Sequence, residues 1–383
     1  MNAGEVLTLE FGETPAAAQT LLHEPSVTWF KPWPGILLNQ SGLPFEPARL
    51  NAGHRPSHAR RLDCLRRVHL LWSNFFVADG RVSTIYDGNA REAVRQVTAY
   101  EELSRYIGIT RRGEDFVVPR ARLRDAQRIA GAVLFATSDE PHNWGLWLLY
   151  VLPAVVHFTQ HRHLYRKLFV FAVHPNMRAL LALLGVRDEE VILHDCGAAY
   201  WFEEVHVFRQ SMRDCYISPA ARQVFAQVRD GVVARLGPSP ARKLYVSRLR
   251  RTREFNAYRG LLDEQALIDR LAALGYFAIE PEFMAVEDQI RHFVGAGRIV
   301  AIGGAGLFNT VFCRDGARIM DIESTPLFLD AHSNVFAGAG LDYGLMIGRE
   351  DPADSSVAHR RWSIDLDAAM PAIAKFMEDA NQA

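Results

Sequence analysis

The feature that most constrains this chain is a run of alternating apolar strands and amphipathic helices across residues 243–323. Its pattern predicts strands at 244–247, 277–279, 299–302 and 318–322 and helices at 263–274 and 286–296. The strand at 299–302 leads into a turn of small residues at 303–306, and the turn opens a further helix. Backbone N–H groups at such a turn can bind a phosphate group. The run therefore predicts a nucleotide-binding half-domain.

The same alternation occurs earlier, from about residue 131 onward. The pattern predicts strands at 132–136, 167–173, 191–194 and 200–208 and helices at 143–158, 176–184 and 219–236. Further upstream, two apolar runs flank Asp79-Gly80, a dipeptide typical of a type I′ hairpin turn. We therefore expect the N-terminal segment to be rich in β-structure.

Gly237-Pro238-Ser239-Pro240 is the clearest linker, because glycine and proline interrupt regular structure. It separates the two alternating runs, so we expect an α/β protein of two Rossmann-like, doubly wound domains that face a cleft. The expected bounds are 1–236 for the N-terminal domain and 241–364 for the C-terminal domain. A last helix, within 365–383, is placed so that it can cross back to the N-terminal domain.

Composition excludes several classes of function. The 43 basic and 44 acidic residues nearly balance, so the chain has no overall basic field for nucleic acid. No pair of the four cysteines has the Cys-x-x-Cys spacing, and the histidines at 157, 161 and 163 lack a carboxylate at a ligand spacing, so no metal site is predicted. With no secretory leader and no apolar run of the roughly 20 residues that a bilayer requires, we expect a cytoplasmic protein.

The turn at 303–306 leaves two interpretations open. Its glycines can simply allow a tight turn and close packing. Alternatively, Gly304-x-Gly306 can be part of a dinucleotide fingerprint, with Asp321 and Glu323 further along, which would indicate an NAD(P)-dependent oxidoreductase.

Basic residues follow the strand at 244–247. The Arg248 guanidinium at the end of this strand can hold a diphosphate in a bidentate manner, and Arg253 and Arg259 are further candidates. The alternative is a solvated basic loop. Glu323 follows the strand at 318–322 and can accept hydrogen bonds from ribose hydroxyls, unless it is only a surface charge at a strand end.

A polar segment follows the strand at 132–136. Asp139, Glu140 and His142 can each act as a general base there. The alternative is that the polar side chains, with Asn143, cap the next helix. Trp144 and Trp147 are three residues apart, so they either pack in the core or stack on a sugar at the lip of the cleft.

Three blocks of the sequence resemble glycosyltransferase family 61, over roughly residues 132–323. Asn143-Trp144-Gly145-Leu146-Trp147-Leu148-Leu149 and Val151-Leu152-Pro153 resemble the family's Asn-Tyr-Gly-His-Trp-Leu…Leu-Pro signature. Leu244-Tyr245-Val246-Ser247-Arg248, Arg259 and Leu262-Asp263-Glu264 resemble its Tyr-x-Ser-Arg…Arg-x-x-Asn-Glu segment. Glu282, Gln289-Ile290, Ala296 and Gly304-Ala305-Gly306-Leu307-x-Asn309 resemble its Pro-Glu…Gln-Ile…Ala…His-Gly-Ala-Gly-Leu-x-Asn segment.

The resemblance implies a GT-B architecture and inverting transfer of a sugar from a nucleotide-sugar donor, usually a UDP-sugar, to a saccharide or glycolipid hydroxyl. Bacterial relatives serve capsular polysaccharide and exopolysaccharide pathways, where a lipid-linked acceptor would bring the enzyme to the inner face of the membrane. It implies no obligatory cofactor or divalent metal, because such enzymes generally stabilise the leaving diphosphate with basic side chains and helix N-termini. The donor would be bound by Arg248, Arg253, Arg259, Gly304, Ala305, Gly306, Leu307, Asn309 and Glu323, and the acceptor side of the cleft would carry Asn143, Trp144 and Trp147.

The chain departs from the family pattern at four positions. Leu146 and Gly303 stand where the family has histidine, Asp263 replaces an asparagine, and Tyr150 stands where an aspartate is common. Two imidazoles are therefore missing from the expected site. Their absence leaves the general base among Asp139, Glu140 and His142, and it keeps a catalytically silent sugar-nucleotide-binding protein as an alternative.

Overall fold

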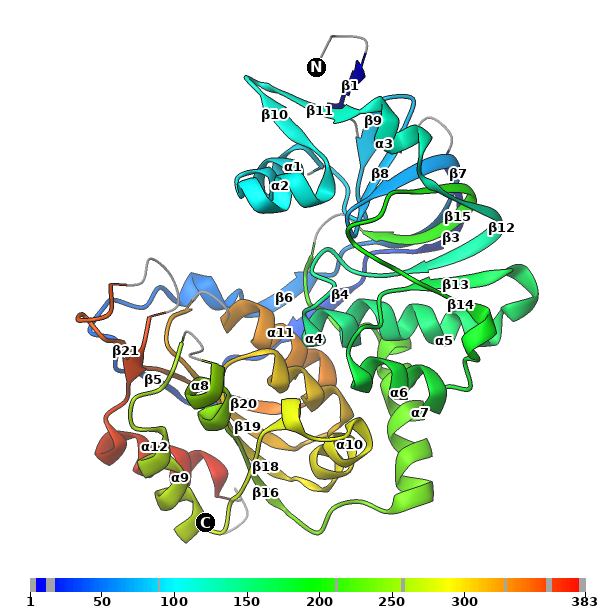
Figure 1. Cartoon of the computed structure of the whole chain (residues 1–383). Helices are drawn as coiled ribbons and strands as arrows, with labels where there is room; N and C mark the ends of the chain where they lie inside the picture. The colour runs from blue at the N-terminus through cyan, green and yellow to red at the C-terminus, as the bar shows by residue number, and fades with distance from the viewer. Residues whose placement is uncertain are drawn as a thin grey trace. The chain divides into compact units, whose positions relative to one another are not determined.

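The computed structural model describes residues 5–11, 18–88, 90–210, 213–255, 259–326, 329–355 and 360–378. The chain folds into two compact units of mixed α/β structure, coloured along the chain in Figure 1. The first unit comprises Met1–Val27 and Pro56–Asp214, and the second comprises Thr28–Arg55 and Cys215–Ala383. The N-terminal part of the chain therefore contributes to both units, whereas the sequence predicted a single boundary near the 237–240 linker.

The first unit is built on a nine-stranded mixed sheet with the order β14-β13-β12-β15-β7-β8-β9-β2, and β3 pairs with β7 outside this path. β12, β13, β14 and β15 are parallel, and β15 is antiparallel to β7. The strands are β2 (Glu10–Phe11), β3 (Gln19–Glu24), β7 (Arg60–Leu71), β8 (Phe75–Ala78), β9 (Arg81–Ser83), β12 (Gln127–Ala136), β13 (Lys167–Val170), β14 (Val191–Leu193) and β15 (Tyr200–Gln210). Figure 1 shows the sheet curling, and Val68, Phe76, Phe135, Phe169 and Phe202 form part of its buried core.

The hairpin predicted around Asp79-Gly80 is confirmed. β8 and β9 are antiparallel neighbours, and φ is 49° at Asp79 and 80° at Gly80, as a type I′ turn requires. The remaining elements at this end are a three-stranded sheet and three helices: β1 (Val6–Thr8), β10 (Thr110–Arg112), β11 (Asp115–Pro119), α1 (Ala90–Thr98), α2 (Glu101–Ile107) and α3 (Arg120–Arg124).

The helix predicted at 143–158 is interrupted. α4 (Trp144–Leu146) continues through a π-helical turn, Trp147–Val151, into α5 (Leu152–Gln160). Pro153 lacks a backbone N–H and its ring clashes with the carbonyl four residues earlier, which accounts for the local widening of the helix. α6 (Pro175–Leu183) follows β13 and is stopped by Gly185, whose φ of 68° is the left-handed conformation common after a helix.

The second unit contains a parallel six-stranded sheet with the order β17-β16-β18-β19-β20-β5. The strands are β5 (Leu37–Asn39), β16 (Lys243–Val246), β17 (Phe277–Ile279), β18 (Arg298–Ile302), β19 (Arg318–Glu323) and β20 (Asp342–Ile347). Counted from β16, the order is 2-1-3-4-5, which reverses between β16 and β18. In open parallel sheets ligands bind beyond the carboxyl ends of the strands at such a reversal.

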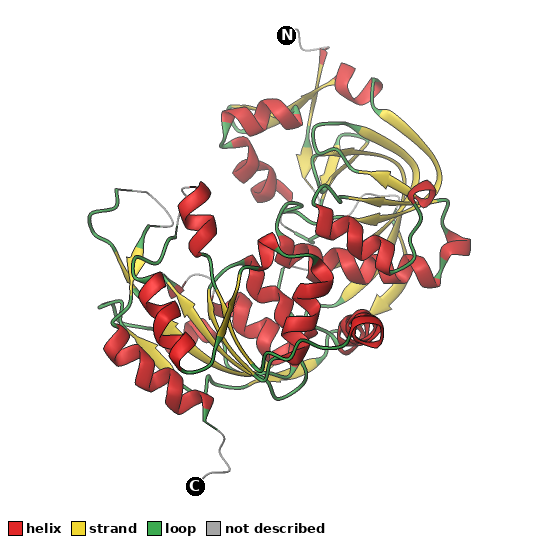
Figure 2. Ribbon diagram, turned by 60° about the horizontal axis from the view of Figure 1, so that its bottom comes forward, coloured by secondary structure: helices red, strands yellow, loops and turns green. Residues whose placement is uncertain are grey.

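Helices cover both faces of this sheet, as Figure 2 shows. They are α7 (Pro219–Leu236), α8 (Leu249–Phe255), α9 (Glu264–Ala273), α10 (Val286–Gly295), α11 (Leu329–Ala339) and α12 (Leu366–Met377), with the 3-10 helix η7 (Ala305–Phe312) after β18. The shorter elements of the two units are η2 (Pro47–Leu50), η4 (Arg162–Leu164), η5 (Asp188–Glu190), η6 (Pro281–Phe283), β4 (Thr28–Lys31), β6 (Gly53–Pro56), β21 (Arg349–Glu350) and β22 (Trp362–Ser363); η4 and η5 lie in the first unit. No helix of the described residues is long and apolar enough to cross a membrane.

The segment Thr28–Arg55 and the C-terminal helix α12 both belong to the second unit. The fully buried Lys31 donates from Nζ to Asp330 Oδ1 at 2.7 Å, and β5 extends the sheet beside β20. α12 buries Ala369 and Ile373 in the same core, where the sequence suggested a helix that crosses to the N-terminal domain. Asp365 caps α12 by accepting from the backbone N–H groups of Asp367 and Ala368.

Candidate active site

The carboxyl ends of β16 and β18 bring two predicted site elements together in the second unit. Arg248 follows β16 by two residues, and Gly303 follows β18 directly. The Arg248 Nη1 atom donates to the Gly303 carbonyl oxygen at 3.0 Å. A side chain at Gly304 would place its Cβ 3.2 Å from the same Nη1 atom, so the turn lies directly against the guanidinium. The Arg248 guanidinium therefore lies beside the glycine turn at the point where the strand order reverses.

Arg248 is held in place by a residue to which the sequence gave no role. The buried Glu264 carboxylate accepts from the Arg248 backbone N–H at 2.8 Å and from the Ser247 hydroxyl at 2.6 Å. Burial raises the pKa of Glu264. Burial also lowers the pKa of Arg248, and the neighbouring charge of Arg259 acts in the same direction. Two guanidinium groups held near each other favour an anion between or beside them.

The expected donor residues of the turn divide into two groups. Gly304, Ala305 and Gly306 are partly exposed, whereas Leu307 and Asn309 are buried. The Asn309 Nδ2 atom donates to Gln289 Oε1 at 3.0 Å and to the Gly306 carbonyl oxygen at 3.1 Å. Asn309 therefore anchors the turn to α10. The turn continues as a 3-10 helix, so the expected helix is present with a tighter geometry.

Glu323 lies behind the turn, fully enclosed. Its Oε2 atom accepts from Arg259 Nη2 at 2.7 Å, and its Oε1 atom is 3.1 Å from His332 Nδ1. A Cβ atom at Gly303 would be only 1.9 Å from Glu323 Oε1, so this carboxylate occupies the space of a side chain at 303. The interpretation of Glu323 as a surface charge is wrong, and contact with a ribose is not available to it in this conformation.

His332 on α11 links Glu323 to Asp321. Its Nδ1 atom is 3.0 Å from Asp321 Oδ2, and all three side chains are buried. Burial alone would lower the pKa of His332, but the two carboxylates raise it to about 10. Burial raises the pKa of Asp321 to about 6, and His332 and Arg259 together lower the pKa of Glu323 against the effect of burial.

Arg259 reaches Glu323 from an unusual backbone conformation. Its φ is 67°, in the left-handed region that a residue with a side chain seldom adopts. The Trp362 Nε1 atom donates to the Arg259 carbonyl oxygen at 2.9 Å and stabilises this conformation. Such strain costs about 1–3 kcal/mol and is found mainly at functional sites.

Arg253 lies elsewhere, on the exposed face of α8. It lines an open groove of about 730 Å³ beside β17, together with Ser247, Glu280 and Phe283. The Arg250 guanidinium stacks 4.0 Å above the Phe283 ring in the same groove. The structure thus separates Arg253 from the contact between Arg248 and the turn.

The three general-base candidates lie in the first unit in different environments. Arg213 pairs with both Asp139 and Glu140, and its Nη1 atom is 2.6 Å from Glu140 Oε1. The Tyr86 hydroxyl also donates to Asp139, at 3.2 Å. His142 is exposed, its ring 4.7 Å from that of Phe171, and no hydrogen bond or ion pair involves it within the described parts of the chain.

The expected acceptor residues are mainly structural. Asn143 Oδ1 accepts from the backbone N–H groups of Gly145 and Leu146 at 3.0 and 3.3 Å, which confirms the alternative that it caps the helix. Trp147 is fully buried and donates from Nε1 to the Phe171 carbonyl oxygen at 2.7 Å. Trp144 is partly buried, and its ring is parallel to that of Trp147 at 6.0 Å.

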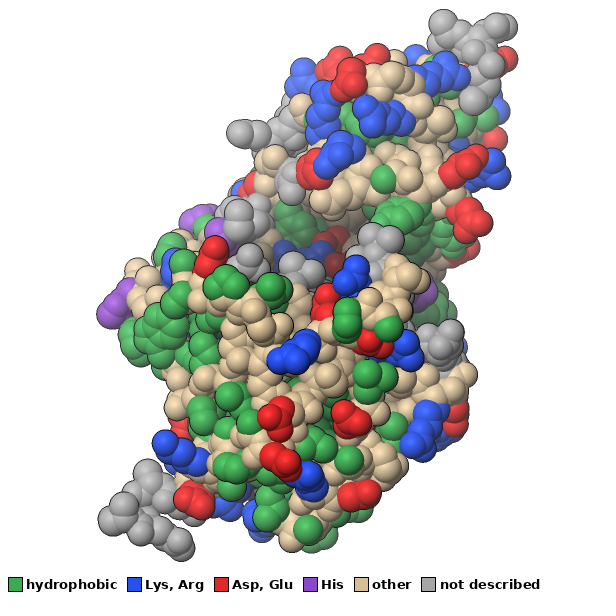
Figure 3. All heavy atoms as spheres, turned by 90° about the vertical axis from the view of Figure 1, so that its left-hand side faces the viewer, with side chains coloured by type: hydrophobic (Ala, Val, Ile, Leu, Met, Phe, Trp, Pro, Cys, Tyr) green, Lys and Arg blue, Asp and Glu red, His purple; other side chains and the backbone are tan. Residues whose placement is uncertain are grey.

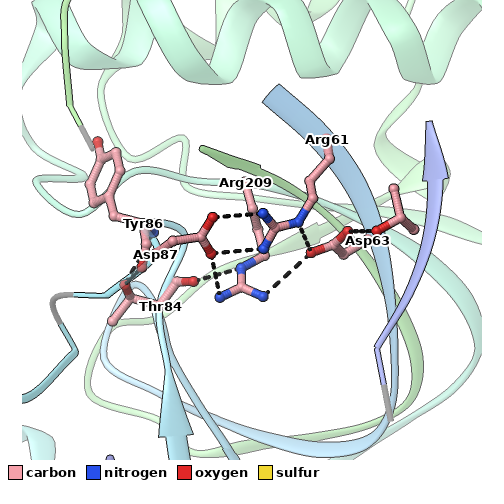
Figure 4. Close-up of polar contacts among 7 residues, drawn as sticks. Arg61, Asp63, Thr84, Tyr86, Asp87 and Arg209 are labelled. Carbon is pink, nitrogen blue, oxygen red and sulfur yellow. Dashed lines mark hydrogen bonds and ion pairs between the residues drawn. The ribbon is translucent and has the colours of Figure 1, made fainter. Parts of the chain in front are cut away.

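Figure 4 shows a network of charged side chains that joins β7 and β15 to the segment 84–87. The guanidinium of Arg209 donates to the Thr84 carbonyl oxygen at 2.9 Å and contacts Asp87 at 3.2 Å. Arg61 pairs with Asp87 at 2.6 Å and with Asp63 at 2.8 Å. Two arginines and two aspartates balance each other, as burial of charge requires. The network fixes the segment 84–87, which carries the Tyr86 hydroxyl to Asp139.

Among the residues that the structure describes, two groups of side chains have the chemistry of metal ligands. Cys64, Glu204 and His206 lie together in the first unit, and Asp321, Glu323 and His332 in the second, each with ligand atoms within 4.8 Å of one another. The sequence missed both, because each group combines two residues of one strand with a third residue from a different element: Cys64 on β7 joins β15, and His332 on α11 joins β19. Glu204 is already paired with Arg66 at 2.8 Å and with His206 at 2.9 Å. These pairs explain its position without an ion.

Residues 82–320, more than half of the 383-residue chain, match the family model described as Glycosyltransferase 61. No curated protein matches the sequence. The matched region includes the capped helix at Asn143, Arg248 and the glycine turn, and it ends before Asp321. The chain belongs to the glycosyltransferase 61 family.

Proposed function

We propose that this glycosyltransferase moves a sugar, with inversion, from a UDP-sugar to a hydroxyl of a saccharide or glycolipid acceptor during polysaccharide or glycoconjugate synthesis. Family membership supports the transferase activity. The main support for placing the donor site here is the contact between Arg248 and the Gly303 carbonyl, where the strand order reverses. We further propose a GT-B arrangement, in which the second unit binds the donor and the first binds the acceptor.

In this proposal the second unit stabilises the leaving diphosphate. The Arg248 guanidinium offers its remaining N–H groups, and the partly exposed backbone at 304–306 offers amide donors. Charge-assisted hydrogen bonds of this kind strengthen as negative charge develops on the leaving group. We therefore propose that no divalent metal or other cofactor is obligatory.

The ribose requires a carboxylate other than the enclosed Glu323. Glu282 is half-buried near Arg248, and burial raises its pKa. We propose that Glu282 accepts hydrogen bonds from the ribose hydroxyls. Glu323 then acts on the donor indirectly, through the position of Arg259.

His142 is the general base that we propose for deprotonating the acceptor hydroxyl. Asp139 and Glu140 are both paired with Arg213, whereas the exposed imidazole of His142 has no hydrogen bond or ion pair with the residues that the structure describes. A histidine is well suited to this task because its ordinary pKa lies near neutral pH.

The surface gives no support to a nucleic-acid partner. On the face drawn in Figure 3, basic and acidic side chains are interspersed, so this face presents no continuous basic surface. We propose that the partners are the nucleotide-sugar and the saccharide, with peripheral membrane association where the acceptor is lipid-linked.

The proposal is tested by calorimetric titration of UDP into the wild type and the Arg248→Ala variant. Loss of a hydrogen bond to a charged group costs about 1.5–3 kcal/mol, so affinity is expected to fall roughly ten- to hundredfold. Arg270→Ala is the matched control, because Arg270 pairs with Asp367 on the surface of the same unit. Equal UDP affinity in wild type and Arg248→Ala would disprove the donor-site assignment.

A catalytically silent nucleotide-sugar-binding protein is the second candidate. Leu146 is buried and Glu323 fills the space at Gly303, so neither position offers an imidazole. Release of UDP from UDP-sugars in the presence of saccharide acceptors separates the two candidates. Tight UDP binding without release would favour the silent protein, and binding of NADH but not UDP would favour an oxidoreductase.

A further inference from the structure

The group formed by Arg259, Asp321, Glu323 and His332 is the most enclosed charged cluster near the proposed donor site. Asp321 and Glu323 have no exposed surface, and the side chains of His332 and Arg259 are 6% and 10% exposed. Their contacts run in a chain: Arg259 to Glu323 at 2.7 Å, Glu323 to His332 at 3.1 Å, and His332 to Asp321 at 3.0 Å. The matched family region ends at residue 320, so it does not include Asp321, Glu323 or His332.

Charge balance favours a proton over a metal ion in this cluster. Buried charges persist when they are paired. Two carboxylates are balanced by Arg259 and a protonated His332, which leaves the four groups neutral as a set. A divalent ion in place of the proton would put an excess of positive charge beside the Arg259 guanidinium, which already occupies Glu323. The aromatic rings of Phe308 and Phe336 pack on His332 at 5.5 and 6.2 Å and separate it from solvent.

The cluster is also connected mechanically to the glycine turn. The Glu323 carboxylate fills the space beside the Gly303 Cα atom, and the Gly303 carbonyl accepts from Arg248. A movement of Glu323 therefore changes both the position of Arg259 and the support behind the turn. His332 opposes that movement, because its Nδ1 atom, hydrogen-bonded to Asp321 Oδ2, is also paired with one carboxylate oxygen of Glu323 at 3.1 Å, while Arg259 donates to the other.

We propose that His332 is a positioning residue for the donor: as a buried cation it holds Glu323 in the space beside Gly303, and thereby aims Arg259 at the donor diphosphate. This inference rests on the proposed function of the turn and Arg248. Its physical basis is that His332 relieves the repulsion between Asp321 and Glu323 and so keeps the Glu323 carboxylate against Arg259.

The test measures the UDP affinity and the thermal unfolding of His332→Gln and His332→Lys. Gln keeps a hydrogen-bond donor without the charge, and Lys keeps the charge. We expect His332→Gln to weaken UDP binding roughly tenfold, as for other indirect couplings within a buried network, and His332→Lys to recover most of that loss. A purely structural role would lower the unfolding temperature in both variants without this difference in affinity.

Two comparisons separate the outcomes. If Arg248→Ala loses UDP affinity but His332→Gln stays within twofold of wild type, the inference fails and the proposed function stands. If neither variant loses affinity, the proposed function itself fails. The inference is also overturned if the purified wild type contains stoichiometric zinc and His332→Gln contains none. A metal ion, and not a proton, would then balance the two carboxylates.

Asp321→Asn provides an independent variant in case His332→Gln does not fold. It removes the carboxylate whose Oδ2 atom is 3.0 Å from His332 Nδ1, and it keeps both partners of the contact between His332 and Glu323. The charge argument predicts at least twofold tighter UDP binding, because the site becomes more positive. Unchanged or weaker binding in a folded Asp321→Asn protein would contradict it.

Discussion

Replacement of Gly303 by alanine should strongly destabilise the second unit. Gly303 does not belong to the glycines with positive φ, so its backbone conformation suits any residue. The obstacle is steric: the new Cβ atom would be 1.9 Å from Oε1, 2.0 Å from Cδ and 2.4 Å from Oε2 of Glu323. Ordinary contacts of this type begin near 3.4 Å, so the carboxylate must move by about 1.5 Å.

The magnitude follows from the contacts that this movement breaks. The ion pairs of Glu323 with Arg259 at 2.7 Å and His332 at 3.1 Å would both lengthen beyond hydrogen-bond distance. Separation of a buried charged pair costs about 3–5 kcal/mol, because an uncompensated charge remains in the interior. We therefore expect Gly303→Ala to lower the free energy of unfolding by about 3–5 kcal/mol.

Urea unfolding measures this loss. Gly297→Ala is the matched control: nothing lies within 4 Å of a Cβ atom there and its φ is not positive, so its stability should stay within about 1 kcal/mol of wild type. In a Glu323→Ala background the obstacle is gone, so Gly303→Ala should lower the free energy of unfolding far less than it does in wild type. The two substitutions should therefore show a large coupling energy. A Gly303→Ala protein as stable as wild type, or equal costs in both backgrounds, would refute the steric argument.

Three further predictions concern stability in urea unfolding. Asn143→Ala should cost about 1 kcal/mol through loss of the helix cap, and Asn143→Asp should restore most of it; no loss in the alanine variant would contradict the capping role. Gly231→Ala should stabilise α7 by about 0.5–1 kcal/mol, since Gly231 is exposed within the helix with open space around its Cα atom, and a destabilised variant would show that the helix is strained there. The raised pKa of His332 contributes stability that is fully present below about pH 6.5 and is lost as the pH rises through about 10. Wild-type stability should therefore fall between pH 7 and 9.5 by up to about 1.4 kcal/mol per pH unit, relative to His332→Gln, and parallel pH profiles of the two proteins would refute a charged His332.

Local patterns in the sequence predicted most of the regular structure that depends on neighbouring residues. The residue pattern placed α7 and β17 at their observed bounds, and Gly185 and Gly275, both with positive φ, follow α6 and α9. Apolar periodicity, proline at the start of α7 and glycine after the helices act within a few residues of the chain. The meeting of Arg248 with the glycine turn was also predictable, because parallel strands place their carboxyl ends at one edge of a sheet.

Other contacts between residues far apart in the chain were not predicted from the sequence. Lys31 and Asp330 meet although 299 positions separate them, so no local pattern assigns β4 and β5 to the second unit. Arg213 was not expected to pair with Asp139 and Glu140 for the same reason. The ribose assignment of Glu323 rested on its place at a strand end, where only the fold shows that Arg259 and His332 enclose the carboxylate.

A crystal structure with UDP bound tests most directly whether Arg248 and the glycine turn bind the donor diphosphate. We expect the diphosphate to lie beyond the carboxyl ends of β16 and β18, with phosphate oxygens about 3 Å from the Arg248 guanidinium and from backbone N–H groups at 304–306. The Glu323 carboxylate should remain paired with Arg259 and His332 in that complex. A diphosphate bound away from Arg248 and the glycine turn would contradict the account.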